Sequence, residues 1–160
     1  MKTRLFIERK NNFDIEKKEL QKDLLTNFGL NLSTLRYFIT YDVFNIDKAI
    51  LGQIINEVFI EINKDNYFFE LPNTRNIIAY ESLPGQFDQR SDSAMQCIRL
   101  LSPNSNPIVN SGVAILFDEV LNEKELYTIK NFLINKVESR EKDFSVFEIP
   151  TYKITSYIEI

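Results

Sequence analysis

The chain has 160 residues, of which 44% are hydrophobic and 26% charged, and its formal net charge is −4. This length and composition fit one folded domain, or two small halves that share a core, and do not fit a long disordered segment. The acidic balance disfavours binding to nucleic acid, and no run approaches the roughly 18 apolar residues that a membrane helix needs.

The residue types that are missing narrow the chemistry. There is no histidine and only one cysteine, Cys97, so Ser-His-Asp and Cys-His catalysis and zinc sites built on histidine or several thiolates are excluded within the chain. The four glycines form no phosphate-binding motif. If the chain belongs to an enzyme, its chemistry depends on carboxylate, lysine or tyrosine side chains, or its active site lies elsewhere. With no disulfide partner and no signal peptide, we expect a cytoplasmic protein.

The first half of the chain reads as strand, helix, strand, helix, strand. A short strand at 5–7 leads through a polar turn to Phe13-Asp14 and a helix with an apolar stripe at Leu20, Leu24 and Phe28, which Gly29 ends. The next predicted elements are a strand at 35–41 that ends at Asp42, a helix from Asn45 with a stripe at Ile50, Ile54 and Val58, and a strand at 67–71.

The second half repeats this order. A strand at 78–80 leads through Pro84-Gly85 to Phe87-Asp88 and a helix with its stripe at Ala94, Cys97, Ile98 and Leu101. Then follow a strand at 113–117, a helix after Asn122 and a strand at 144–149. The repeat predicts an α+β fold of tandem β-α-β-α-β units. We expect ferredoxin-like-related halves, 1–75 and 76–150, with helices packed on a largely antiparallel sheet and a pseudo-twofold axis between them.

Helix entry explains the polar residues that begin the helices. Asp14, Asp88 and Asn122 are predicted helix caps, since a side-chain oxygen there accepts from a free amide of the first turn. The Phe before each Asp is a candidate hydrophobic staple. The alternative, that residues 84–90 form a catalytic loop, is weakened because Asp14 begins its helix without a neighbouring Gln-Arg pair.

Other polar residues have two interpretations. Gln86, Gln89 and Arg90 fit either plain surface or a docking contact, and Ser139, Arg140 and Glu141 fit either a solvated turn or an interdomain contact. Cys97 is predicted to be a core residue. Tyr37 and Tyr41 belong to the core face of their strand, with Thr40 outward; base stacking on an open sheet face is the less favoured reading.

The segment LPGQFDQRSDSAMQCIRLL (83–101) closely resembles the N-terminal region of the large, single-chain phosphoribosylformylglycinamidine synthases. The resemblance extends to RLFIERKNNFDIEKKELQKDL, RYFITYDVFNI and FLINKVESRE and covers roughly residues 4–141. The chain departs from the family's pattern at Asn11-Asn12, where Pro-Gly is common, at Lys136, where Pro is usual, and most of all after Val58.

The resemblance implies a part of a larger enzyme of purine biosynthesis. That family is a ligase and glutamine amidotransferase that uses ATP and Mg²⁺, bound in a synthetase domain absent here, to convert formylglycinamide ribonucleotide to formylglycinamidine ribonucleotide. Its N-terminal domain resembles a fused pair of the small subunits of multi-subunit forms and bridges the synthetase and glutaminase domains. Residues 151–160 would then begin a linker toward the synthetase domain. The segment alone is predicted to be non-catalytic, with no catalytic, metal-binding or cofactor-binding residue, and could self-associate.

Two alternatives stay open at this point: a small ligand-binding or regulatory module of ferredoxin-like type with a pocket between its halves, and an RNA-binding domain that uses the tyrosines.

Overall fold

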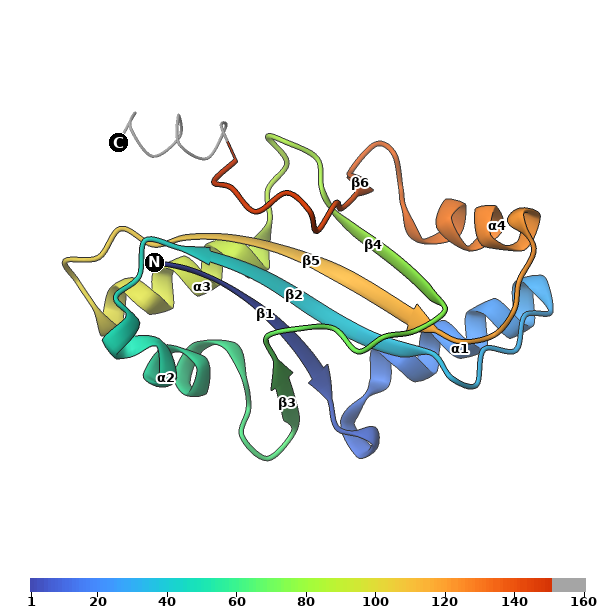
Figure 1. The fold of residues 1–160 in the computed structure, drawn as a ribbon, viewed down its shortest axis with the longest axis horizontal. Helices are drawn as coiled ribbons and strands as arrows, with labels where there is room; N and C mark the ends of the chain where they lie inside the picture. The colour runs from blue at the N-terminus through green and yellow to red at the C-terminus, as the bar shows by residue number, and fades with distance from the viewer. Residues whose placement is uncertain (151–160) are drawn as a thin grey trace.

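The computed structural model describes residues 1–150 and shows the predicted order of elements, β-α-β-α-β, twice (Figure 1). The predicted linker start at 151–160 lies outside the described residues. The first half contains β1 (Lys2–Arg9), α1 (Ile15–Phe28), β2 (Arg36–Phe44), α2 (Leu51–Ile54) and β3 (Asp65–Phe68). The second contains β4 (Asn76–Ser82), α3 (Gln89–Leu101), β5 (Ile108–Phe117), α4 (Glu123–Leu133) and β6 (Ser139–Glu141).

All six strands form one antiparallel sheet with the order β3-β1-β2-β5-β4-β6. The strand order of the first half is the mirror image of that of the second, so β1, β2 and β3 correspond to β4, β5 and β6. The central strands β2 and β5 join the halves, with Ile39 opposite Val113 and Thr40 opposite Gly112. This α+β fold is the predicted one: two ferredoxin-like-related halves about a pseudo-twofold axis through the β2–β5 pair.

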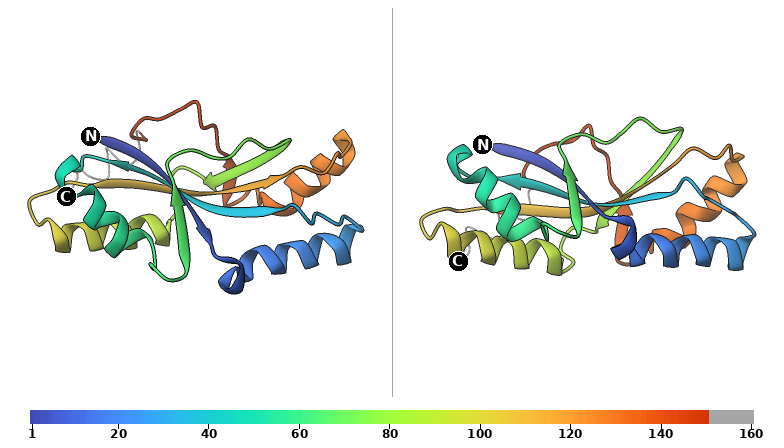
Figure 2. Two further views of the ribbon diagram at one scale, coloured as in Figure 1. Left: turned by 60° about the horizontal axis from the view of Figure 1, so that its bottom comes forward. Right: turned by 90° about the horizontal axis from the view of Figure 1, so that it is seen from below.

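The helices lie on one face of the sheet and pack across the halves. Figure 2 shows α1 beside α4 at one end and α3 beside α2 at the other. One core cluster joins Leu20 and Leu24 of α1 to Ile129 of α4, and the other joins Ala94 and Ile98 of α3 to residues of α2 and the following turn. Each cluster therefore takes residues from both halves, and neither half buries its own helices alone.

The first helix ends as the sequence predicts. Gly29 has φ 67°, in the left-handed region that favours glycine, and its amide donates to the Leu25 carbonyl at 3.0 Å. The helix predicted from Asn45 is instead broken into three short pieces: a 3₁₀ turn (Lys48–Ile50), α2, and the π-helical turn η3 (Ile55–Phe59).

The opposite face of the sheet is also covered, a feature that the sequence pattern does not predict. Phe6, Phe38 and Leu116 form a third buried cluster, against which Phe68, Leu71 and Phe144 pack. Residues 142–150 cross this face without forming a strand (Figure 2). Thr40, predicted to point outward, lies on this face and is fully buried.

A network of buried charges fastens residues 142–150 to the sheet. The Lys142 ammonium lies 3.1 Å from both Asp42 and Glu81, and its side chain is 3% exposed. Arg4 pairs with Asp42 at 2.6 Å and donates to the Phe144 and Val146 carbonyls. The Phe144 and Val146 carbonyls thus accept from a side chain and not from a neighbouring strand, and the predicted strand at 144–149 is wrong. The last strand is β6, and Asp42 lies within β2 instead of ending it.

Candidate functional site

Two helices begin near the middle of the same sheet face. Both views in Figure 2 show α1 and α3 running outward from the centre, with their N-termini facing each other. The Asp14 carboxylate accepts from the Lys17 amide at 3.2 Å, and the Asp88 carboxylate accepts from the Ser91 amide at 3.2 Å. Each aspartate thus caps its helix through the amide three residues later.

The Asp88 cap is tied to the sheet as well. The Ser111 hydroxyl of β5 donates to the Asp88 oxygens at 2.7 and 2.8 Å, and the Ser91 hydroxyl also donates to Asp88. Asp14 is more deeply buried than Asp88, but its Oδ2 atom has no hydrogen-bond partner among residues 1–150. Burial raises the pKa of the Asp14 carboxyl above its usual value, although the Lys17 amide opposes this.

The third predicted cap forms a complete capping box at the start of α4. Asn122 accepts from the Glu125 amide at 2.8 Å, and the Glu125 carboxylate accepts from the Asn122 amide at 3.0 Å. The two staples are not formed: the Phe13 side chain is 42% exposed and that of Phe87 is 76% exposed.

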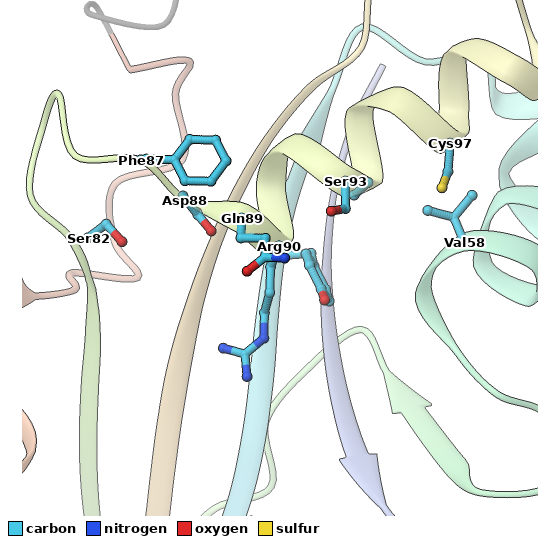
Figure 3. Close-up of a pocket in the computed structure, with 10 residues that line it drawn as sticks. Val58, Ser82, Phe87, Asp88, Gln89, Arg90, Ser93 and Cys97 are labelled. Atoms are coloured by element: carbon cyan, nitrogen blue, oxygen red, sulfur yellow. The ribbon is translucent and has the colours of Figure 1, made fainter.

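A groove runs along the helix face where the two N-termini meet. It consists of two adjoining cavities, of about 550 and 410 Å³, which share Tyr41, Val58 and Arg90. Figure 3 shows the first of them: Arg90 extends from the first turn of α3 over the strands, while Ser93 and Cys97 follow along the helix. We call this feature the helix-face groove.

Cys97 lies in this groove and is exposed, so the predicted core position is wrong. Ala94 and Ile98 on the same helix are buried. The side chain of Cys97 instead lies near Val58 of η3 (Figure 3). The buried stripe of α3 is narrower than the sequence pattern suggested because the short α2–η3 segment covers only part of the helix.

The tyrosines of the sheet lie beneath the helices. Tyr37 and Tyr41 are partly buried against the two helix-side core clusters, so they are not presented on an open sheet face as base stacking would require. Burial raises the pKa values of Tyr37, Tyr41 and Tyr80, an effect that the charge of Arg90 opposes. Their hydroxyls therefore stay neutral at physiological pH.

The structure joins the two segments that carry the predicted docking residues. Ser139 of β6 pairs with Ser82 of β4, and the Leu83 amide donates to the Glu138 carbonyl at 2.9 Å. The loop that follows Leu83 carries Gln86, which is exposed, as are Gln89 and Arg90 in the first turn of α3.

Two of the predicted docking residues of β6, Arg140 and Glu141, have ion-pair partners within the domain. Arg140 lies 3.1 Å from Glu81, and Glu141 lies 3.1 Å from Lys130. Both side chains are partly exposed, so these pairs contribute little to stability and leave the groups accessible to another surface.

The buried charges around Lys142 are the residues that sequence reasoning missed. Asp42, Glu81 and Lys142 are far apart in the sequence, and no spacing links them. A weak signal was the glycine at the flank of the predicted strand at 113–117, because a glycine inside a strand often marks a close approach of other atoms. A Cβ at Gly112 would lie 2.8 Å from the Tyr80 carbonyl oxygen and 3.2 Å from the Lys142 side chain.

The described part of the chain, residues 1–150, contains no group of three or more His, Cys, Asp or Glu side chains placed to hold a metal ion. Within the same range, no helix is both long and apolar enough to span a bilayer.

Fold and groove together define a doubled α+β domain with a single antiparallel sheet. Comparison with known proteins found no matching family model, no matching curated protein and no matching solved structure.

Proposed function

We propose that this chain is a non-catalytic assembly domain of an ATP- and glutamine-dependent amidotransferase of the phosphoribosylformylglycinamidine synthase type. The proposal starts from the resemblance of residues 4–141 to the N-terminal region of that family. The doubled fold supports it, because a domain that resembles a fused pair of small subunits is expected to have two equivalent halves.

The observation that carries the proposal is the joining of two resembling segments into one surface. Residues 83–101 and 132–141 are separate in sequence, yet the Leu83–Glu138 hydrogen bond and the β4–β6 ladder hold them together. Phe87 and Val137, one in each segment, are both 76% exposed. Large apolar side chains exposed close to polar groups are typical of protein interfaces. We call this surface the β6 edge.

The domain's contribution to the enzyme would be geometric. Its central β2–β5 ladder and its two shared cores make the halves one rigid unit. A rigid unit docked through the β6 edge holds the synthetase and glutaminase domains at a constant separation. Ammonia released at the glutaminase then reaches the synthetase with less loss to water.

A reconstitution assay tests this proposal. The chain is mixed with the synthetase and glutaminase portion of a single-chain enzyme of this family that lacks its own N-terminal region. We expect no turnover by the chain alone and glutamine-dependent product from the mixture. A Phe87→Ser, Val137→Ser double variant should lower this activity about tenfold or more, the effect of losing an apolar interface contact.

Phe69→Ser is the matched control, because Phe69 is 52% exposed beyond β3, the strand at the opposite edge of the sheet. It should leave the reconstituted activity unchanged. Turnover by the chain alone, or no gain in activity on mixing, would overturn the proposal. An in-frame synthetase and glutaminase downstream of Ile160 would support it directly.

A further inference from the structure

The half of the helix-face groove nearest α1 has an excess of negative charge. This cavity of about 410 Å³ is lined by five carboxylates and two arginines. The carboxylates are those of Asp14, Glu16, Glu57, Glu61 and Asp65, and the arginines are Arg9 and Arg90.

Arg9 is already neutralised by two of these carboxylates. It lies 3.3 Å from Glu61 and 3.3 Å from Asp65, and the Asp65 carboxylate also accepts from the Glu61 amide at 2.8 Å. Asp14, Glu16 and Glu57 remain, with Arg90 as the other cation of the lining. The cavity therefore attracts a positively charged group.

Asp14 provides a separate observation that points to a ligand. Its side chain is among the most buried polar groups of the domain, with 1% of the residue exposed, and it lines the cavity. Only Oδ1 is used by the helix cap, and Oδ2 has no hydrogen-bond partner within residues 1–150. A buried carboxylate oxygen without a donor is costly, and an entering N–H group would remove that cost.

The aromatic wall of the cavity fits an organic cation. The rings of Tyr41 and Phe59 lie 4.7 Å apart and both line the cavity. Aromatic faces attract ammonium and guanidinium groups. The carboxylates do not form a metal-binding group in the described range, so the chemistry favours an organic cation over a metal ion.

We propose that the α1 half of the groove binds an alkylammonium or guanidinium group, with Asp14 as its buried acceptor and Glu57 at the entrance. The group belongs either to a free small amine or to a lysine or arginine side chain of a partner protein. The inference does not depend on the proposed assembly function, because the lining of the α1 half contains neither Phe87 nor Val137, the residues on which the assembly test rests.

Titration calorimetry with agmatine, which carries a guanidinium and an ammonium group, tests the site on the whole chain. We expect saturable binding that weakens with added salt, since charges partly open to water are screened. Asp14→Asn keeps the helix cap, because asparagine caps as well as aspartate does. It should nevertheless weaken binding about tenfold or more, as the loss of a charged hydrogen bond predicts.

Two further variants make the test specific. Glu57→Gln, at an exposed position, should weaken binding by about threefold, as expected for a partly screened charge. Asp47→Asn is the control: it also removes a capping carboxylate, which accepts from the Ala49 amide outside the groove, and it should leave binding unchanged. No binding of agmatine up to about a thousandfold excess over the protein, or equal losses in Asp14→Asn and Asp47→Asn, would overturn the proposal.

A second probe separates the two sources of the cation. Arginine blocked as an amide at both ends presents a guanidinium as a protein side chain does. Binding of both probes, each lost in Asp14→Asn, supports a partner's side chain as the occupant. Binding of agmatine alone supports a free amine. Reconstituted amidotransferase activity is measured separately with Phe87→Ser, Val137→Ser, so failure of one proposal leaves the other intact.

Discussion

Asp14 and Asp88 cap equivalent helices with the same bond, yet their second carboxylate oxygens have different surroundings. In each, Oδ1 accepts from the amide three residues later at 3.2 Å. Asp88 also accepts from the Ser111 hydroxyl of β5, whereas Oδ2 of Asp14 has no partner among the described residues. The two halves thus share the hydrogen bond that begins the helix, but they differ in whether the capping carboxylate also binds the sheet.

Replacement of the two caps should therefore have unequal costs. Asp14→Ala should lower the free energy of unfolding by about 1 kcal/mol, the usual value for a lost cap. Asp88→Ala should cost about 2–3 kcal/mol, because it also leaves the Ser111 hydroxyl without its acceptor. Urea denaturation of both variants measures the difference, and equal losses would contradict it.

The stability of the protein should depend on pH through Asp14. Its folded-state pKa is raised above the ordinary value of 3.8, mainly by burial, so the folded protein holds this proton more tightly than the unfolded chain. The stabilising contribution is complete below pH 3.8 and is lost as pH rises through the folded-state pKa. Asp14→Asn should remove this loss, so unfolding free energies of variant and wild type should diverge as pH rises. Curves that stay parallel would refute the assignment.

Gly112 should not tolerate a side chain. An added Cβ would lie 2.8 Å from the Tyr80 carbonyl oxygen and 2.9 Å from the Thr40 hydroxyl, and the backbone atom cannot move aside cheaply. Gly112→Ala should lower the unfolding free energy by about 1–3 kcal/mol. Gly52→Ala is the control, because its Cβ meets no atom within 4 Å and alanine favours the helix. The thermal midpoint should fall for the first variant only.

The Cys97 thiol should react in the native protein. Because Cys97 is exposed on α3, a chromogenic disulfide reagent should label one thiol per chain without denaturant. Labelling that requires urea would place the thiol in the core, as the sequence pattern had suggested.

The helices and their N-terminal caps could be predicted from the sequence, because the interactions that form them are local. Apolar spacing predicted α1 and α3, and Asp14, Asp88 and Asn122 each sit where a free helix amide needs an acceptor. The helix after Asn45 was predicted less accurately, since the π-helical turn Ile55–Phe59 breaks the 3.6-residue period on which such predictions rest.

The repeated β-α-β-α-β order follows from the amino-acid pattern alone, since periodicity and capping depend on residues a few positions apart. Three arrangements could be seen only in the folded protein: α1 packs with α4 across the halves, Lys142 is buried between Asp42 and Glu81, and Asp14 lines a cavity. These arrangements join residues far apart in the chain. Their stability depends on which surfaces pack together when the two halves fold, and a local sequence pattern does not contain that information.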